Sequence, residues 1–222
     1  MLEDLVVIGA GGFGREVVDV IEAINESESS PRWRLVGVVD DSPSEENVDR
    51  LERRGIPYLG TVETLVADVA RPKFVSAIGS PRVRRAIATD LENEGFVPAT
   101  IVHPASTTGS VVSIGAGTVI CAGVRLTTNI SVGRHCHLNL NATVGHDSVL
   151  MDFVSINPLA SISGDCIVED DVLIGVCASI INQVTVHAGA TVGGGACAVR
   201  DVPPDATVVG IPAVPLGKKR SS

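Results

Sequence analysis

A six-residue period dominates the pattern of apolar and polar positions in the second half of the chain. Every sixth residue from Ile114 to Val192 is Ile, Leu or Val, and the series closes at Ala198. Four residues after each of these lies a second column of almost wholly small or β-branched residues, which runs from Thr118 to Ala196. This regularity predicts a solenoid of short strands and turns, in which three rungs close a triangular coil of about 18 residues.

The two columns predict what fills the interior of the coils. The aliphatic column stacks on itself inside, and the small column points inward near the corners, where space is tight. Glycine follows the aliphatic residue at positions 115, 133, 145, 175 and 193. The stretch from Ile114 to Ala198 is long enough for about four to five coils. Cys136 and Cys166 belong to the small column, so we expect both to be buried packing thiols.

The first hundred residues follow a different pattern, in which apolar runs alternate with stretches of helical spacing. Strands that alternate with helices predict a parallel α/β sheet. The predicted strands cover residues 5–8, 35–39, 74–78 and 97–102, and the predicted helices cover residues 15–22 and 82–94. We therefore predict a Rossmann-like domain over residues 1–102 and a parallel β-helix domain with a C-terminal tail over residues 103–222.

The run Gly9-Ala10-Gly11-Gly12-Phe13-Gly14 matches the pattern GxGxxG between the first strand and the first helix. Glycines let the backbone approach a phosphate there, and the helix N-terminus presents unpaired N–H groups to it. Asp40, at the end of the second strand, is placed to accept hydrogen bonds from ribose hydroxyls. The residues predicted to bind this ligand are Gly9, Gly11, Gly12, Phe13, Gly14, Asp40, Asp41, Gly79 and Ser80. A tight turn that binds nothing is the alternative interpretation.

The length of this first domain narrows the choice of ligand. About 100 residues hold one βαβ-type half, whereas a dinucleotide normally spans two. A mononucleotide, or a nucleotide that carries a sugar, therefore fits better than NAD.

Composition excludes several other classes of protein. The formal net charge of −9 argues against a nucleic-acid partner. The five cysteines include no CxxC pair, which argues against a disulfide framework or a structural zinc site and fits a reducing, cytoplasmic compartment. No run of about 18 apolar residues is present, so we expect neither export nor a membrane span.

Three segments together resemble a known family. They are "VVIGAGGFGREV" at the N-terminus, "NATVGHDSVL" within the repeat and "GGGACAVRDVPPDATVVGIPA" at its end. They are similar to the bacterial sugar O-acyltransferases of the sialic acid O-acetyltransferase type, which include the UDP-4-amino-sugar N-acetyltransferases of the PglD type. The resemblance implies a left-handed β-helix, acetyl-CoA bound along it, a nucleotide-linked amino sugar in the first domain, and a homotrimer with active sites between subunits.

The resemblance also assigns residues to the chemistry of acyl transfer. It implies that His146 is the general base, since histidine commonly titrates near neutral pH, and that Asp147 orients its ring. It implies that Asn139 is a polar contact in the active site and that the Gly164 N–H donates to the thioester carbonyl oxygen. The expected reaction is acetyl-CoA-dependent N-acetylation of a nucleotide-linked 4-amino sugar, which feeds surface glycans.

The cofactor contacts implied by the resemblance include one departure from the family pattern. Some relatives carry a second histidine nine positions after the base, and Ser155 occupies that position here. Lys218, Lys219 and Arg220 are candidates to attract the phosphates of coenzyme A, with a solvated tail as the alternative. The residues predicted to contact the cofactor are Ser155, Gly164, Gly175, Gly193, Gly194, Gly210, Ile211 and Pro212.

Four alternatives remain at this point. O-acetylation of a sugar such as sialic acid uses the same base. An NAD-dependent oxidoreductase requires a second half-domain, and a non-catalytic scaffold requires only the solenoid. A zinc site is the fourth, built from His135, His137 and His146; we predict no metal, because ligand types alone do not establish a site.

Overall fold

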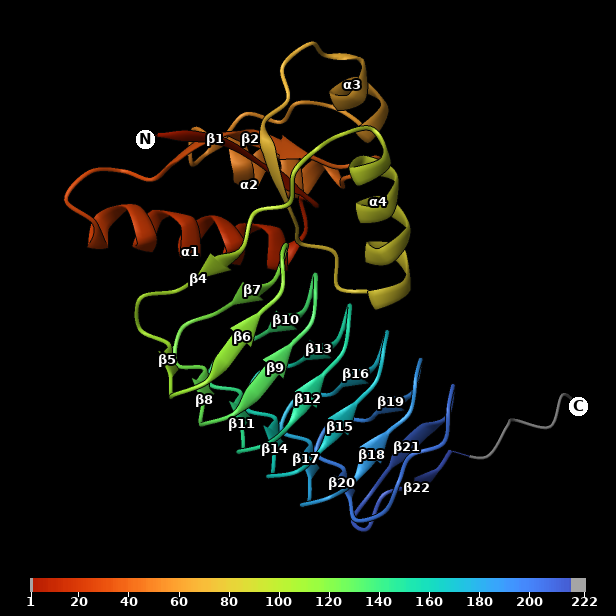
Figure 1. Cartoon of the computed structure of the whole chain (residues 1–222). Coiled ribbons are helices and arrows are strands. Elements are labelled where there is room, and N and C mark those ends of the chain that lie inside the picture. Colours follow the sequence, from red (N-terminus) through yellow and green to blue (C-terminus); the bar gives the residue numbers. More distant parts are fainter. Residues whose placement is uncertain (1, 217–222) are drawn as a thin grey trace, which may run out of the picture.

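The structure, a computed structural model, describes residues 2–216 and consists of an α/β domain followed by a left-handed parallel β-helix (Figure 1). The predicted fold class is therefore confirmed. None of the helices in the described residues is both long and apolar enough to cross a membrane. The α/β domain comprises β1 (Glu3–Ile8), α1 (Gly12–Ser27), β2 (Trp33–Val39), α2 (Glu45–Glu52), α3 (Val62–Ala67), β3 (Lys73–Ser76) and α4 (Pro81–Asn93).

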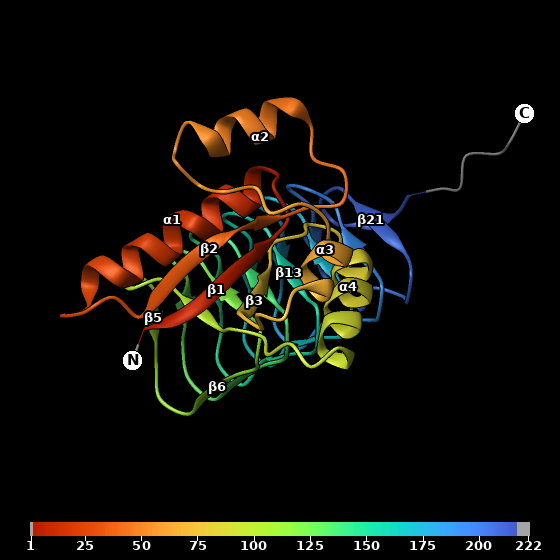
Figure 2. The same cartoon turned by 90° about the horizontal axis from the view of Figure 1, so that it is seen from above.

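The three strands of this domain form a parallel sheet in the order β2-β1-β3. Helix α1 lies between that sheet and the start of the β-helix, and α4 runs along the side of the domain (Figure 1, and Figure 2 from above). Val17 and Ile21 of α1 share one apolar cluster with Ile101 and Val119 of the first coils. The two domains are thus joined by a continuous core.

The β-helix has three faces, each a parallel sheet. The first face contains β4 (Ile101–Val102), β7 (Val119–Ile120), β10 (His137–Leu138), β13 (Ser155–Ile156), β16 (Leu173–Ile174), β19 (Thr191–Val192) and β21 (Thr207–Val209), to which β22 (Val214–Pro215) adds an antiparallel edge. The second contains β5 (Thr107–Thr108), β8 (Arg125–Leu126), β11 (Thr143–Val144), β14 (Ser161–Ile162), β17 (Ser179–Ile180) and β20 (Cys197–Ala198). The third contains β6 (Val112–Ile114), β9 (Ile130–Val132), β12 (Val149–Leu150), β15 (Ile167–Val168) and β18 (Thr185–Val186).

The strand register confirms the predicted coil. Leu138 pairs with Ile156, and Val144 pairs with Ile162, so neighbouring strands on a face come from successive coils. The aliphatic and the small columns lie together in one buried cluster along the axis. Cys136 and Cys166 are fully buried in it, and burial raises the pKa of the Cys136 thiol to about 12. Both are packing thiols, as predicted.

Two predictions about the start of the β-helix are wrong. The strand predicted over residues 97–102 is divided between the two domains. Residues 97–99 form a single bridge to Phe74 of β3, whereas Ile101–Val102 pairs with β7 of the β-helix. The α/β ladder stops there because the Ile101 N–H donates to the Thr118 carbonyl oxygen of the β-helix. The β-helix therefore starts before Ile114 and has about six turns, more than the four to five predicted. Thr108, in the second rung, interrupts the aliphatic column, so the sequence pattern did not reveal that the β-helix begins before Ile114.

Each rung also contains a residue with left-handed backbone at a corner of the coil. Asn129, Asp147 and Asp165 have φ values of 54°, 60° and 57°. Asn and Asp tolerate this conformation better than most residues. These three side chains are exposed, whereas His135 and Phe153 occupy equivalent corners and are buried.

Candidate active site

The glycine-rich loop connects β1 to α1, and its glycines have different tasks. Gly9 has a φ of +114°, and a Cβ on Gly14 would overlap the Gly9 carbonyl oxygen, so these two shape the turn. Gly11 has no protein atom within van der Waals contact of its open side, and Gly12 meets only the tip of Arg15. Gly11 is the N-cap of α1 and supplies no side-chain cap. The loop therefore leaves room for an anion at the helix N-terminus.

Both acidic residues after β2 are hydrogen bonded to backbone. Asp40 Oδ2 accepts a hydrogen bond from the Ala10 N–H at 2.8 Å, and its Oδ1 accepts one from the Ser42 N–H at 3.0 Å. Asp41 accepts one from the Val62 N–H at 2.8 Å. Asp40 thus braces the glycine-rich loop, and its partly exposed carboxylate retains lone pairs for a hydroxyl donor.

A hollow of about 270 Å³ opens beside this loop, and we call it the loop pocket. It combines two carboxylates with apolar side chains, which suits a flat ligand with a polar edge, such as a nucleobase with its ribose. The lining residues are Ile8, Gly9, Asp40, Asp41, Ser42, Val62, Ile78, Val83 and Ile87.

Three residues that were predicted to bind the same ligand do not line the loop pocket. Gly79 and Ser80 line a wider hollow of about 600 Å³ between the start of α4 and the first face of the β-helix, and the Ser80 hydroxyl caps α4. Phe13 packs against the ring of His137, with 4.6 Å between the ring centroids. The chain after β3 therefore contributes Ile78 to the loop pocket, whereas Gly79 and Ser80 face the hollow beside the β-helix.

His146 lies at the corner between the second and third faces, directly after β11. Its Nδ1 is 2.7 Å from Asp147 Oδ2, and the Asn129 side chain donates to Asp147 Oδ1 at 2.6 Å. With the carboxylate as acceptor, Nδ1 carries the hydrogen and Nε2 is left as the acceptor. The Asn129 amide, and then the His146 ring, hold the pKa of the Asp147 carboxyl below its ordinary value. The imidazole is 53% exposed, so a ligand from outside can reach it.

Gly164 lies against this imidazole from the next coil. A Cβ on Gly164 would lie 2.5 Å from both Cε1 and Nε2 of His146, so only glycine leaves the ring in its place. Gly164 is buried, and within residues 2–216 its N–H donates no hydrogen bond, so the chain itself leaves this donor unused. The predicted general base and the predicted oxyanion donor are thus neighbours.

Asp165 is a third polar group at this corner, and the sequence reasoning missed it. The ligand atoms of His146, Asp147 and Asp165 all lie within 4.8 Å of one another, and all three residues are exposed. The spacing from Asp147 to Asp165 is one coil of the register, so the repeat itself contains the signal that places both at the same corner. Imidazole and carboxylate are also metal-ligand types, but Asp147 already engages Nδ1 of the ring.

The other two histidines of the zinc alternative are buried, and each has a hydrogen-bond partner inside the protein. His137 Nε2 is 2.7 Å from the Ser76 carbonyl oxygen, and His135 Nε2 is 2.8 Å from a Glu92 carboxylate oxygen, both buried at the domain junction. Among the described residues, neither joins His146 in a cluster of metal-ligand type. The zinc triad considered from the sequence is therefore wrong.

Two side chains that were predicted to contact a ligand make hydrogen bonds within the protein instead. The Asn139 side chain is buried and donates to the Ile156 carbonyl oxygen at 3.1 Å and to Asn157 Oδ1 at 3.3 Å. Ser155 is also buried, and its hydroxyl accepts a hydrogen bond from Arg84 at 2.9 Å. The structure assigns Ser155 to the domain junction instead of to the cofactor.

The remaining glycines predicted to contact the cofactor lie where coils stack closely. A Cβ on Gly175 would lie 2.5 Å from the Gly194 nitrogen, and one on Gly193 would lie 2.7 Å from Val209. Gly210 has a φ of +93° and starts the turn that contains Ile211 and Pro212, of which Ile211 is largely exposed. Lys218, Lys219 and Arg220 lie outside the described residues.

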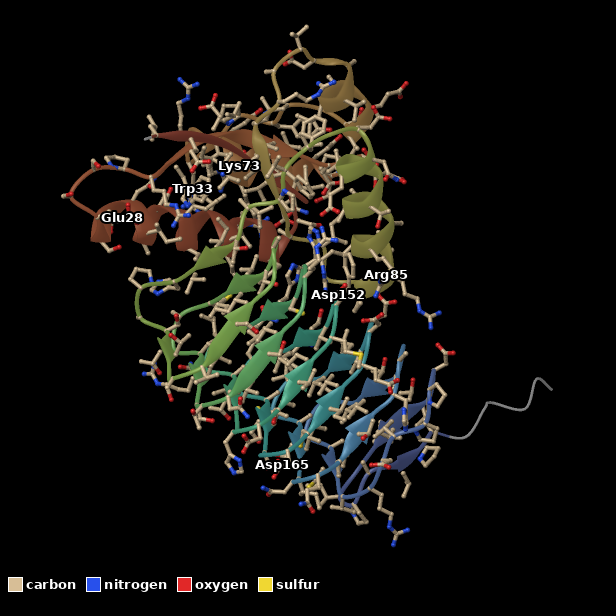
Figure 3. The ribbon with its side chains drawn as sticks, in the orientation of Figure 1. Glu28, Trp33, Lys73, Arg85, Asp152 and Asp165 are labelled. Atoms are coloured by element: carbon tan, nitrogen blue, oxygen red, sulfur yellow. The ribbon has the colours of Figure 1, made fainter. Side chains whose placement is uncertain are left out.

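The loop pocket and the His146 corner lie on separate parts of the chain. In Figure 3 Asp165, the neighbour of His146, lies on the part of the β-helix away from the α/β domain, and the loop pocket belongs to the α/β domain. The chain therefore presents an imidazole and a nucleotide-sized pocket in different domains.

A β-helix of hexapeptide rungs with an imidazole–carboxylate pair at one corner fits the hexapeptide-repeat acetyltransferases, and solved structures of similar fold belong to this class. The model of the PglD N-terminal domain family matches residues 4–91. The GDP-perosamine N-acetyltransferase of Escherichia coli O157:H7 is 31% identical over 204 residues, which span 92% of this chain and 81% of that protein. The chain belongs to the acetyl-CoA-dependent sugar N-acetyltransferase family that includes this enzyme.

Solved structures agree with this assignment. PerB from Caulobacter crescentus, in complex with CoA and GDP-perosamine, is 27% identical with a TM-score of 0.85, over 96% of this chain and 97% of that one. The acetyltransferase domain of PglB from Neisseria gonorrhoeae FA1090, in complex with acetyl coenzyme A, is 29% identical with a TM-score of 0.82, over 97% and 100%. The oxidoreductase and the non-catalytic scaffold considered from the sequence are therefore wrong.

Proposed function

We propose that the protein transfers the acetyl group of acetyl-CoA to the amino group of a GDP-linked 4-amino sugar, with His146 as the general base. One arrangement carries the proposal. Asp147 fixes the imidazole through Nδ1, which leaves Nε2 as an acceptor, and Gly164, whose N–H donates no hydrogen bond in residues 2–216, packs against the same ring. The relatives named for GDP-perosamine favour a GDP-linked acceptor.

The proposed reaction uses these groups in sequence. Nε2 of His146 removes a proton from the sugar amine as its nitrogen attacks the thioester carbonyl carbon. The carbonyl oxygen becomes an oxyanion and accepts a hydrogen bond from the Gly164 N–H. The ionised Asp147 stabilises the imidazolium. When the C–S bond breaks, the thiolate of coenzyme A leaves and takes the proton from the imidazolium, which restores the base.

A panel of acceptors tests the proposed reaction. Release of free thiol from acetyl-CoA would be measured with GDP-, UDP- and TDP-linked 4-amino sugars and with free sialic acid. We expect turnover with the GDP-linked amino sugar. Turnover with sialic acid alone would contradict N-acetylation, and a preference for UDP-linked sugars would contradict the choice of nucleotide.

We also propose that the active site is completed in a homotrimer, where a neighbouring subunit brings its His146 to the loop pocket. The third face beside Asp147 carries a hollow of about 390 Å³ with exposed apolar residues on it, among them Val111 and Val149. An exposed apolar surface next to a catalytic corner is typical of a subunit contact. The three flat faces of the β-helix suit threefold association.

Mixed oligomers test whether two subunits share one site. His146→Ala removes the base and Gly11→Val weakens binding of the GDP-linked sugar, so at an acceptor concentration near the wild-type KM each variant alone is expected to turn over much more slowly than the wild-type protein. Co-expressed, the two are expected to recover part of the wild-type rate, because some sites combine an intact pocket with an intact base. The absence of recovery in a purified mixed oligomer would mean that each site lies within one subunit. Analytical ultracentrifugation of the wild-type protein gives the subunit number.

Asp165→Asn is expected to lower kcat by about two- to fivefold, the size of an exposed charge interaction. The Asp165 carboxylate lies near the ring that becomes positively charged during the reaction, so its removal weakens the stabilisation of the imidazolium. Asp171→Asn serves as the control. Asp171 lies one six-residue rung after Asp165, at the next corner of the coil, where its carboxylate binds Arg85. A loss of kcat as large as that of His146→Ala would instead make Asp165 an essential group.

The cytoplasm is the compartment that we propose for this reaction. All five cysteines are free thiols in the structure, which suits a reducing environment.

A further inference from the structure

Arg84 lies on α4 at the junction of the two domains, and its guanidinium is fully buried. The side chain is 0% exposed. Its Nε donates to the His135 carbonyl oxygen at 2.9 Å, and its Nη1 donates to the Ile78 carbonyl oxygen at 2.7 Å. Its Nη2 donates to the Phe153 carbonyl oxygen at 2.8 Å and to Ser155 Oγ at 2.9 Å. All three nitrogens therefore have partners, on both sides of the junction.

The four acceptors are neutral, which makes this burial of charge unfavourable. No carboxylate in residues 2–216 hydrogen bonds to Arg84, and the nearby Asp171 binds Arg85 at 2.9 Å instead. Desolvation lowers the pKa of Arg84 to about 10. Burial of a charge without an anion has a desolvation cost, and removal of the guanidinium would leave four acceptors at the junction without their donor. What the planar guanidinium supplies is direction, because its N–H donors point along fixed lines.

The acceptors of Arg84 belong to parts of the molecule that the reaction must align. Ile78 lies in the wall of the loop pocket. His135 and Phe153 occupy corresponding positions in two successive coils of the β-helix, and their rings stack 5.0 Å apart between centroids. The labelled Arg85 and Asp152 mark this junction in Figure 3. One side chain thus ties the pocket wall to two coils.

We propose that Arg84 is a positioning residue that sets the orientation of the loop pocket relative to the β-helix. It thereby sets the direction in which a bound acceptor projects toward the catalytic imidazole. This inference rests on the proposed function, in which the acceptor and the acetyl donor are held by different domains. A small rotation at the junction displaces the amine from the thioester carbon, and displacements of about 1 Å cost up to about 100-fold in rate.

The kinetic test compares Arg84→Met with Arg85→Met, the next residue on α4. Arg85 also reaches the β-helix, through Asp171, but it does not line the loop pocket. With a GDP-linked 4-amino sugar as acceptor, kcat of Arg84→Met is expected to fall about 10- to 100-fold while KM for acetyl-CoA stays unchanged. Arg85→Met is expected to keep its kcat. Equal kcat values for the two variants, per folded enzyme, would overturn the proposal.

Scanning calorimetry gives a readout that needs no substrate. The wild-type protein and Arg85→Met are expected to unfold in one transition, and Arg84→Met in two, because the α/β domain then separates from the β-helix first. Arg84→Lys keeps the charge but lacks the planar fork, so it is expected to fold and still to lose kcat; it replaces Arg84→Met if that variant does not fold. One transition and wild-type kcat in both Arg84 variants would overturn the proposal. Two transitions in Arg84→Met, with a wild-type enzyme inactive on every amino sugar, would support it while contradicting the proposed function.

Discussion

His146→Ala is expected to lower kcat by about 10²- to 10⁴-fold, the usual contribution of a positioned general base. The fold is expected to survive the change, because the imidazole is half exposed and leaves no buried donor without a partner. Asp147 keeps its hydrogen bond from Asn129. Initial rates of thiol release from acetyl-CoA at saturating acceptor give kcat, and thermal unfolding reports the fold.

His187→Ala is the matched control for this variant. His187 also pairs with a carboxylate, at 3.1 Å from Glu169, and it is partly exposed on the same β-helix. It lies away from Gly164, so its loss is expected to leave kcat unchanged. A wild-type rate in His146→Ala would remove the imidazole from the proton transfer, whatever the geometry of the corner.

Gly11→Val is expected to raise KM for the GDP-linked sugar about 10- to 100-fold, which corresponds to about 1.4–2.8 kcal/mol of binding free energy. A side chain at Gly11 would occupy the open space at the N-terminus of α1, where a phosphate approaches. Its φ of −66° is accessible to valine, so the backbone remains unstrained. KM for acetyl-CoA is expected to stay the same, because the β-helix binds that substrate.

Gly14→Ala provides the contrast that separates binding from folding. A Cβ on Gly14 would overlap the Gly9 carbonyl oxygen, so this substitution is expected to lower the midpoint of thermal unfolding and to affect both substrates. Gly11→Val is expected to cost only about 1 kcal/mol of stability, through the weaker N-cap. An equal rise of both KM values in Gly11→Val would mean that it, too, acts by disturbing the fold.

The six-residue period was sufficient to predict the β-helix because each rung repeats the same packing problem. Ile156 and Ile174 meet the same neighbours one coil apart, so the pattern survives in the sequence. The prediction failed at residues 97–102, where Ala99 and Ile101 pack with α1, and at Thr108, which is exposed and interrupts the aliphatic column. A strand of two residues at Ile101–Val102 has no periodicity of its own that tells which sheet it joins.

The candidate site was predictable in part for the same reason. His146 and Asp147 are adjacent in the chain, and their contact needs no long-range information. Asp165 lies one coil away and is found only when the register is known. Phe13 and Ser155 were expected to contact ligands, but each packs at a junction between domains that local patterns do not encode.

The sequence by itself determined the class of fold, the glycine-rich loop and the imidazole–carboxylate pair, because each depends on residues within a few positions or at one fixed period. Only the tertiary structure decided which of the predicted side chains are exposed beside a hollow and which are used between the domains. Arg84 shows the physical reason: its four acceptors come from segments up to 71 residues away in the chain, and no local rule brings them together.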